Sequence, residues 1–213
     1  MSLAVQETIQ THRLLPVIEI QDIAQAEPLA KALIDGGLPL AEVTFRSKAA
    51  PDAIRRMAGF ADLCVGAGTI INVEQARLAI ECGARYLVSP GTFPEVIAFA
   101  RSKQIPIFPG IATPTDIGNA LAAGVDVLKF FPAEAYGGLA TLKALSGPYP
   151  QVKFVPTGGI NEQNLASYLA HPKVLACGGS WMVEKSLLAA GNWSEVRTRV
   201  AAAVQRVRQA TAA

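Results

Sequence analysis

One lysine of the chain lies inside an otherwise apolar run. Lys129 interrupts the segment Val127–Phe131, whose other residues are valine, leucine and phenylalanine, a composition typical of a buried strand. A buried ammonium is costly unless it is paired or loses its proton, and a mid-strand lysine cannot easily reach water. The neutral amine is a nucleophile toward carbonyl carbon, and burial beside another cation favours that form. Lys129 is therefore a candidate for covalent catalysis through a Schiff base.

Three polar residues alternate with apolar ones earlier in the chain, at Glu42, Thr44 and Arg46. Side chains along a strand alternate between its two faces, so these three share one face. If the apolar face packs against helices, the polar face points inward and Arg46 lies at the rim of the sheet. Glu42 is then a candidate general acid or base. An edge strand with one wet face, or a structural Glu42–Arg46 ion pair, would produce the same pattern.

Glycine pairs follow two late apolar runs. The segment Thr157–Asn161 contains one pair and opens an expected helix, and the segment Gly178–Ser180 contains the other. Glycine lets backbone N–H groups approach a ligand closely, and barrel enzymes often bind phosphate after their last two strands. Ordinary turns also use glycine, so each pair alone is weak evidence. Two pairs in these positions favour a phosphate site.

The elements that must position these residues alternate along the chain. The expected strands are Leu14–Ile20, Leu40–Phe45, Leu63–Gly66, Tyr86–Ser89, Ile105–Phe108, Val127–Phe131, Lys153–Pro156 and Val174–Cys177. The expected helices begin near Ile23, Pro51, Val73, Pro94, Pro114, Leu139, Glu162 and Trp193. Residues suited to capping the starts of helices are Asn72, Thr92, Thr113 and Asn161. Glycines expected at the ends of helices are Gly36, Gly83 and Gly124.

Eight consecutive strand–helix units without a linker predict one domain over residues 1–213. We expect an α/β fold of the (β/α)8 TIM barrel type, preceded by a short helix at Gln6–His12. A doubly wound open sheet is the structural alternative. The barrel is favoured because eight units close naturally into one, and no dinucleotide-binding glycine motif follows the first strand.

Composition restricts the class of partner. Hydrophobic residues make up 51% and charged residues 17% of the 213 residues, and the net charge is +2, so neither disorder nor a nucleic-acid partner is expected. A small anionic substrate remains compatible. Neither a signal peptide nor an apolar run of about 18 residues is evident, so we expect no membrane partner and a cytoplasmic location. Three separated cysteines argue against a disulfide framework: Cys64, Cys82 and Cys177.

Six short motifs in order resemble those of the 2-keto-3-deoxy-6-phosphogluconate (KDPG) aldolases, also described as 4-hydroxy-2-oxoglutarate aldolases. The motifs are Glu42–Arg46, Gly66–Thr69, Ser89–Gly91, Lys129–Glu134, Pro156–Ile160 and Gly178–Trp181. The resemblance extends from about Leu14 to the last helix. It implies a homotrimeric lyase of the Entner–Doudoroff pathway that reversibly cleaves KDPG to pyruvate and glyceraldehyde 3-phosphate. It also implies a covalent lysine Schiff base with no metal or other cofactor.

The resemblance also implies roles for residues at matching positions. Lys129 corresponds to the Schiff-base lysine, Glu42 to the general acid/base, and Thr157 to the residue that reads the configuration of the aldehyde half. The pocket for the pyruvyl carboxylate corresponds to Arg46, Thr69 and Pro90. The phosphate cradle corresponds to Gly158, Gly159, Gly179 and Ser180. His12 and His171 are far apart in the expected fold, which argues against a metal-dependent aldolase.

Other functions remain open at this level. A sugar-phosphate epimerase or an indole-glycerol-phosphate-type lyase shares the phosphate cradle but does not explain Lys129 facing Glu42. A non-catalytic sensor of sugar phosphates would bind ligand without turnover. Among aldolase substrates, KDPG, its galactonate epimer and 4-hydroxy-2-oxoglutarate (cleaved to pyruvate and glyoxylate) share the pyruvyl half. The sequence assigns no role to Glu19 or Lys48.

Overall fold

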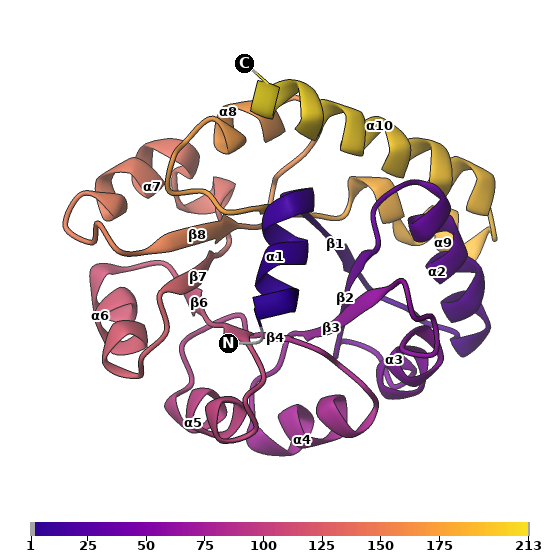
Figure 1. Cartoon of the computed structure of the whole chain (residues 1–213), viewed down its shortest axis with the longest axis horizontal. Helices are drawn as coiled ribbons and strands as arrows, with labels where there is room; N and C mark the ends of the chain where they lie inside the picture. Colours follow the sequence, from indigo (N-terminus) through magenta and orange to yellow (C-terminus); the bar gives the residue numbers. More distant parts are fainter. Residues whose placement is uncertain (1–2, 213) are drawn as a thin grey trace.

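The computed structural model describes residues 3–212, and every strand pair in that range is parallel. The strands curl around the centre of the molecule and, apart from the first helix, the helices lie outside them (Figure 1). The fold is therefore α/β with a curled parallel sheet. This confirms the predicted alternation of strands and helices.

The elements follow one another in the predicted order. The strands are β1 Leu14–Ile18, β2 Leu40–Thr44, β3 Cys64–Gly68, β4 Leu87–Val88, β5 Ile107–Phe108, β6 Gly110–Ile111, β7 Val127–Phe130, β8 Lys153–Pro156 and β9 Cys177–Gly179. The α-helices are α1 Leu3–His12, α2 Ala26–Asp35, α3 Ala50–Met57, α4 Val73–Glu81, α5 Pro94–Ser102, α6 Pro114–Ala122, α7 Gly138–Ser146, α8 Leu165–Leu169, α9 Lys185–Ala189 and α10 Trp193–Ala212. Short 3-10 turns are η1 Ile23–Gln25, η2 Glu134–Tyr136 and η3 Trp181–Val183.

The strands form two groups that meet at β8 and β9. One group runs in the order β5-β4-β3-β2-β1-β9 and the other in the order β6-β7-β8. Two isolated parallel bridges, Phe154 with Val174 and Thr157 with Gly178, connect β8 to the segment around β9. Neighbours in the sheet are mostly neighbours in sequence, without the reversal of strand order that a doubly wound sheet requires. The doubly wound alternative is therefore not supported.

The predicted bounds of the fifth and eighth strands differ from the observed ones. The expected fifth strand, Ile105–Phe108, appears as β5 and β6 on either side of Pro109, which has no N–H to donate to a ladder. The carbonyl of Pro109 still accepts a hydrogen bond from the amide of Lys129, at 2.9 Å. The expected eighth strand begins later, at Cys177, and Val174 contributes only a single bridge.

The predicted helix caps are partly confirmed. Thr113 and Asp116 form a reciprocal capping box at α6, and the side chain of Asn72 accepts the amide of Gln75 at α4. Thr92 does not cap α5, because its hydroxyl donates to the carbonyl of Gly110 instead. The helix expected near Glu162 begins only at α8, and Asn161 accepts amides within the preceding turn.

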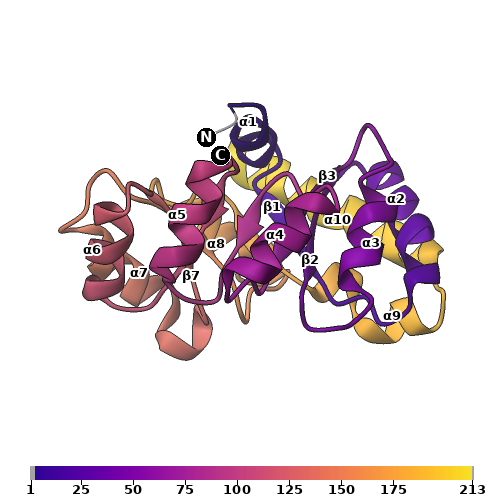
Figure 2. The same cartoon turned by 90° about the horizontal axis from the view of Figure 1, so that it is seen from below.

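The first helix closes one end of the curled sheet. Figure 1 shows α1 across the middle of the ring of strands, and Figure 2 shows it on one side of the strand layer. Its Val5 and Ile9 side chains are buried in the core, and β1 begins two residues after it ends. The candidate site must therefore lie at the opposite end, where the strands finish.

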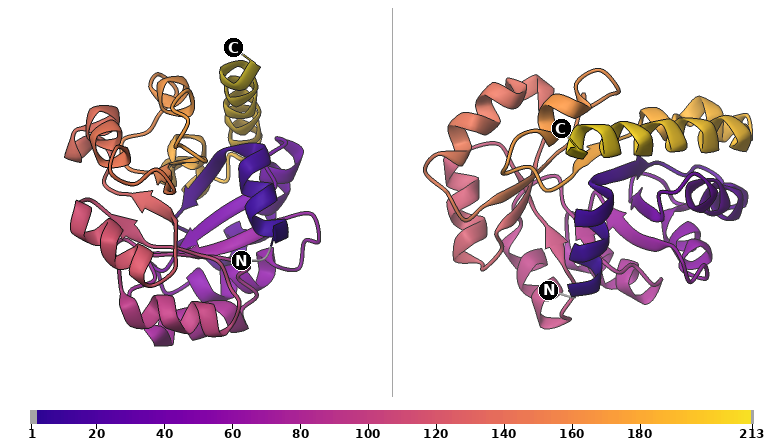
Figure 3. Two further views of the ribbon diagram at one scale, coloured as in Figure 1. Left: turned by 60° about the vertical axis from the view of Figure 1, so that its left-hand side comes forward. Right: turned by 45° about the horizontal axis from the view of Figure 1, so that its top comes forward.

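The last helix covers the outer surface beside the first units of the chain. α10 packs against α2 and α8, and the right-hand view of Figure 3 shows it as a long rod along one edge of the molecule. Its buried residues include Val196, Val200 and Ala203. None of the described helices is long and apolar enough to span a membrane.

Candidate active site

The buried polar side chains mark the centre of the curled sheet. Among residues 5–211, whose side chains the structure describes, they are Glu42, Thr44, Ser89, Lys129 and Thr157. Three of these, Glu42, Lys129 and Thr157, are residues that the sequence analysis assigned to the site. Buried polar groups are retained only where they find partners or perform a function, so their convergence indicates a site.

Lys129 and Glu42 face each other from different parts of the sheet. Nζ of Lys129, on β7, lies 3.4 Å from Oε1 of Glu42, on β2. The lysine is 5% exposed and the glutamate 1% exposed, so water screens the pair weakly. The ammonium also lies 4.9 Å from the centre of the Phe131 ring, a cation–π contact. The orientation of Lys129, which alternation alone left open, is thus inward.

Two glycines of β3 make room for this pair. A Cβ atom on Gly68 would lie 2.3 Å from Oε1 of Glu42, and one on Gly66 would lie 2.2 Å from the ring of Tyr86. Tyr86 is fully buried and donates a 2.8 Å hydrogen bond to the carbonyl of Ala41, and burial raises the pKa of its hydroxyl well above the ordinary value. The expected end of this strand at Gly66 was wrong: the strand continues to Gly68, because the glycines serve packing and not a turn.

Arg46 lies just beyond the end of β2 with its guanidinium held on one side. Its Nε donates a 3.1 Å hydrogen bond to Oγ1 of Thr44 and lies 3.3 Å from Oε2 of Glu19. Its side chain is 46% exposed, so the remaining donors face the open end of the site. Within residues 3–212 no Glu42–Arg46 ion pair forms, since Glu42 pairs with Lys129 and Arg46 with Glu19. The structural ion pair considered from the sequence is therefore wrong.

Glu19 is a residue to which the sequence assigned no role. It follows β1 and forms ion pairs with Arg46 and with Lys185, whose Nζ lies 2.7 Å from Oε1 of Glu19. The available signal was an acid inside the apolar run at the end of the first strand. Its partners could not be found, because Lys185 is 166 positions away in sequence.

Thr69 directly follows β3, Pro90 lies two residues beyond the end of the neighbouring strand β4, and both are half-buried. Thr69 has a backbone φ of 60°, which is unusual for a β-branched residue. Such strained backbones occur where the surrounding structure enforces them, often at functional sites. The structure thus brings both residues to the same edge as Arg46.

The two glycine pairs also reach this edge. Gly158 and Gly159 have φ values of 95° and 81°, a conformation that only glycine adopts easily. Among the hydrogen bonds of the described chain, none uses the amide of Gly159 or Ile160 as a donor. These amides are therefore available to an anion.

Thr157 and the second glycine pair pack beside the first. Thr157 is buried, and a Cβ on Gly178 would lie 2.3 Å from its Oγ1. Gly179 is similarly closed in, because a Cβ there would lie 1.9 Å from the ring of Trp181. Ser180 follows β9 and is exposed. Glycine at these two positions lets Thr157 and Trp181 occupy the space beside the site.

Glu134 packs against the first glycine pair, Gly158 and Gly159. Its amide donates to the carbonyl of Gly158, and a Cβ on Gly159 would lie 2.5 Å from its Cγ. Its carboxylate accepts a hydrogen bond from the hydroxyl of Tyr168, on α8. Burial, followed by this contact, raises the pKa of Tyr168. Glu134 thereby joins the segment after β7 to the segment after β8.

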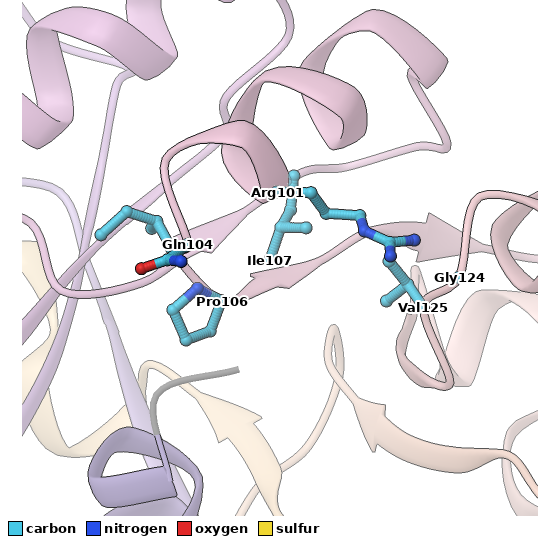
Figure 4. Close-up of a pocket in the computed structure, with 7 residues that line it drawn as sticks. Arg101, Gln104, Pro106, Ile107, Gly124 and Val125 are labelled. Carbon is cyan, nitrogen blue, oxygen red and sulfur yellow. The ribbon is translucent and has the colours of Figure 1, made fainter.

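A separate cavity lies away from these residues. A cavity of about 550 Å³ opens between the segments that lead into β5 and β7, at the end of the sheet where strands begin (Figure 4). Its lining consists of Arg101, Gln104, Ile105, Pro106, Ile107, Gly124 and Val125. No residue predicted for the site lines it. Within the part of the chain that the structure describes, no three His, Cys, Asp or Glu residues lie close enough together to hold a metal ion.

The arrangement can perform carbonyl chemistry. A buried amine beside a buried carboxylate supplies a nucleophile and a group that moves protons. A guanidinium lies at one side of the open end, and free backbone amides lie at the other. The site therefore suits a small substrate that carries a carbonyl between two anionic groups.

Comparison with known proteins gives a consistent result. The model of the aldolase family "KDPG and KHG aldolase" matches residues 5–199. A 2-dehydro-3-deoxy-phosphogluconate aldolase of Treponema pallidum (strain Nichols) is 50% identical over 191 residues, which cover 89% of this chain and 91% of that protein.

Solved structures of the same kind superpose closely. The KDPG aldolase of Legionella pneumophila, with pyruvate captured as a covalent carbinolamine intermediate, has a TM-score of 0.90 and 39% identity, covering 93% of this chain and 97% of that one. The 2-keto-3-deoxy-6-phosphogluconate aldolase of Zymomonas mobilis ZM4 with 3-phosphoglycerate has a TM-score of 0.88 and 37% identity, covering 93% and 94%.

Proposed function

Because the chain belongs to the KDPG and KHG aldolase family, we propose that it is a class I aldolase that reversibly cleaves KDPG to pyruvate and glyceraldehyde 3-phosphate. The observation that carries the proposal is the buried contact of 3.4 Å between Lys129 and Glu42. The carbinolamine captured in the Legionella pneumophila enzyme supports the covalent mechanism.

Lys129 is the nucleophile of this mechanism. Glu42 takes a proton from the ammonium, and the neutral amine attacks the C2 ketone of the substrate to give a carbinolamine. Loss of water, with a proton supplied to the leaving hydroxyl, gives an iminium ion. The iminium accepts the electron pair of the C3–C4 bond when that bond breaks, so the reaction needs no metal or organic cofactor.

Glu42 moves the protons of the cleavage. As the C3–C4 bond breaks, Glu42 takes the proton of the C4 hydroxyl, directly or through a water molecule, and the aldehyde leaves. The enamine that remains on Lys129 then receives a proton at C3, and hydrolysis of the imine releases pyruvate. Proton transfer by a placed carboxylate contributes about 10²–10⁴-fold to rate.

The two ends of the site bind the two anionic ends of the substrate. Arg46 holds the pyruvyl carboxylate with charge-assisted hydrogen bonds, and Thr69 and Pro90 complete that pocket. Thr157 contacts the aldehyde half and reads its configuration. The phosphate binds to the backbone amides and hydroxyl of Gly158, Gly159, Gly179 and Ser180. The structure of the Zymomonas mobilis ZM4 aldolase contains 3-phosphoglycerate, a phosphorylated carboxylate.

We further propose that the curled sheet is a closed (β/α)8 barrel in a single domain over residues 1–213. β5 and β6 are then two halves of one strand, separated only by Pro109. The bridges between β8 and the β9 segment close the ring on the other side. Closure of this kind explains how β2 and β7, which are not neighbours in the sheet, present their side chains to each other.

A second substrate follows from the same site. 4-Hydroxy-2-oxoglutarate shares the pyruvyl half with KDPG, and the matching family model includes KHG aldolases. Its cleavage to pyruvate and glyoxylate would use Lys129, Glu42 and Arg46 in the same way. The free amides of Gly159 and Ile160 favour the phosphorylated substrate, because 4-hydroxy-2-oxoglutarate has no phosphate to bind there.

The assembly and location are proposed on the family relationship alone. We propose a homotrimer in the cytoplasm, whose mass in solution can be measured by light scattering coupled to size-exclusion chromatography. The described cysteines are free and buried, as expected in a reducing compartment.

Trapping with pyruvate tests the function directly. The protein is incubated with pyruvate and sodium borohydride, and the modified peptide is located by mass spectrometry. We expect one reduced adduct, on Lys129, and none in the Lys129→Met variant. Adducts confined to exposed lysines, or no adduct, would exclude the Schiff-base mechanism and favour an epimerase or a sensor on the same fold. Coupled assay of pyruvate release from KDPG and from 4-hydroxy-2-oxoglutarate then ranks the substrates.

A further inference from the structure

A carboxylate that the proposed mechanism does not use lies beside Arg46. Glu19 follows β1 between the buried residues Ile18 and Ile20, and its side chain is only 10% exposed. A carboxylate this buried is retained only when it is paired, because desolvation disfavours the charged form. Its partners therefore indicate what it does.

The two oxygens of Glu19 contact different partners. Oε1 accepts hydrogen bonds from Nζ of Lys185 at 2.7 Å and from Nε2 of Gln21 at 2.6 Å. Oε2 faces Nε of Arg46 at 3.3 Å. Lys185 begins α9, a few residues after Ser180. Glu19 thus connects the guanidinium at one end of the site to the segment that follows the phosphate end.

The orientation of Arg46 follows from these contacts. Its Nε faces Oε2 of Glu19 and donates a hydrogen bond to Oγ1 of Thr44. The hydroxyl of Thr44 is itself fixed, because it donates to the carbonyl of Ile18 at 2.8 Å. Within the described residues, no hydrogen bond or ion pair engages Nη1 or Nη2 of Arg46. The free edge of the guanidinium is the one that can form paired hydrogen bonds with a carboxylate.

We propose that Glu19 is a positioning residue that fixes Arg46 for the carboxylate of the substrate, an inference that rests on the proposed function. An arginine side chain that is nearly half exposed loses rotamer freedom when it binds a ligand, and Glu19 and Thr44 remove that cost in advance. Glu19 also separates the two cations Arg46 and Lys185. Together Arg46, Lys185 and Glu19 carry one net positive charge, which favours binding of the substrate carboxylate.

The test compares two ketones that differ in the carboxylate. Wild-type protein, Glu19→Gln and the control Glu184→Gln are titrated with pyruvate or with acetone in the presence of borohydride, and the adduct on Lys129 is quantified. Glu184 is a suitable control, because it pairs with Arg199 and lies next to Lys185 but outside the site. In Glu19→Gln we expect the pyruvate concentration for half-maximal trapping to rise about tenfold, and that for acetone to stay unchanged. Glu184→Gln should behave as wild type with both ketones.

A merely structural role of Glu19 would give a different result. Disturbance of the whole site would weaken acetone and pyruvate trapping equally, and release of electrostatic repulsion would strengthen pyruvate trapping; either result overturns the proposal. Glu19→Asp, which keeps the charge but withdraws it from Arg46, should shift pyruvate in the same direction if Glu19→Gln does not fold. In an Arg46→Gln background, Glu19→Gln should add no further effect. If wild-type protein forms no adduct on Lys129, the proposed function fails, and not this inference alone.

Discussion

Nζ of Lys129 and Oε1 of Glu42 lie 3.4 Å apart in space and 87 positions apart in sequence. β2 and β7 belong to different groups of strands, so the contact exists only because the sheet curls far enough to bring them together. Both side chains are almost completely buried, and removal of either leaves the other without its charged partner. A buried ion pair broken in this way typically costs about 3–5 kcal/mol. Isosteric substitutions are therefore the informative ones.

Glu42→Gln should separate imine formation from turnover. The amide keeps the shape of the carboxylate but cannot accept the proton of the C4 hydroxyl, so we expect kcat for KDPG cleavage to fall about 10²–10⁴-fold. The adduct with pyruvate and borohydride should still form on Lys129, but more slowly, because the ammonium must then lose its proton to water and not to Glu42. The measurements are steady-state kinetics and peptide mass spectrometry. Full activity in Glu42→Gln would remove this residue from the mechanism.

Gly68→Ala should displace the carboxylate of Glu42 while leaving the glutamate itself in place in the sequence. The added methyl group would lie 2.3 Å from Oε1 of Glu42, so the carboxylate must move and turnover should fall toward that of Glu42→Gln. The matched control is Gly118→Ala in α6, where a Cβ meets nothing within 4 Å and alanine should stabilise the helix by about 0.5–1 kcal/mol. Kinetics and urea unfolding distinguish the two variants. Wild-type turnover in Gly68→Ala would contradict the packing argument.

The sequence identifies those functional residues whose burial costs free energy unless they are paired or take part in chemistry. A lysine inside an apolar strand has few explanations other than pairing or chemistry, so Lys129 could be identified from its own segment. Alternation within one strand likewise predicts that Glu42 and Arg46 share one face of that strand. The order of strands and helices follows from local periodicity, which is why the α/β class could be predicted from the sequence.

Features that depend on contacts between distant segments could not be predicted. The expected end of the third strand is Gly66, before Gly68, because only the position of Glu42 on the neighbouring strand shows that Gly68 makes space within the sheet. Glu19 had no interpretation until its partners Arg46 and Lys185 were known. Thr92 matched a helix cap in sequence, but its hydroxyl donates to Gly110 on a neighbouring segment. In each of these cases a tertiary contact overrides the local pattern.

Gly159→Ala should weaken binding of the phosphate end. Gly159 has a φ of 81°, and a Cβ there would lie 2.5 Å from Cγ of Glu134, so the loop must move away from Glu134. We expect KM for KDPG to rise about tenfold or more, with little change in trapping of pyruvate, which has no phosphate. Steady-state kinetics and trapping measure the two effects.

Gly37→Ala is the matched control for this substitution. Gly37 has the same φ of 81°, but a Cβ there meets nothing within 4 Å. Both variants should lose about 1–2 kcal/mol in the free energy of unfolding, because alanine is strained in this region. Only Gly159→Ala should change KM. Equal kinetic effects in the two variants would mean that general destabilisation, and not the phosphate site, is responsible.

Tyr168→Phe should show whether the hydrogen bond from Tyr168 holds Glu134 in the position that supports the phosphate-binding loop at Gly158 and Gly159. The hydroxyl of Tyr168 donates to the carboxylate of Glu134, and hydrogen bonds to charged groups contribute about 1.5–3 kcal/mol. Loss of this bond should lower the free energy of unfolding by about that amount and raise KM for KDPG. Urea unfolding and kinetics check both effects. Tyr149→Phe, which removes a hydroxyl that donates to Pro114 on the outer surface, should leave KM unchanged.

Histidine protonation should make the fold less stable in mild acid. Burial, followed by the charge of Arg208, lowers the pKa of His12 below its ordinary value of 6.5. Burial and two nearby lysines lower the pKa of His171 in the same direction. Below about pH 6.5 the unfolded chain therefore binds more protons than the native one, and the free energy of unfolding falls as the pH decreases toward the native pKa values. At higher pH the two imidazoles are neutral in both the native and the unfolded chain, so their contribution to the free energy of unfolding does not change with pH.

The variants His12→Gln and His171→Gln test the origin of this slope. Each should reduce the loss of unfolding free energy between about pH 7.5 and about pH 5.5, measured by urea denaturation, and the double variant should reduce it most. Since neither histidine lies near Lys129 or Glu42, kcat at neutral pH should equal that of wild type. An unchanged slope in the double variant would contradict the assignment of the acid sensitivity to the two histidines.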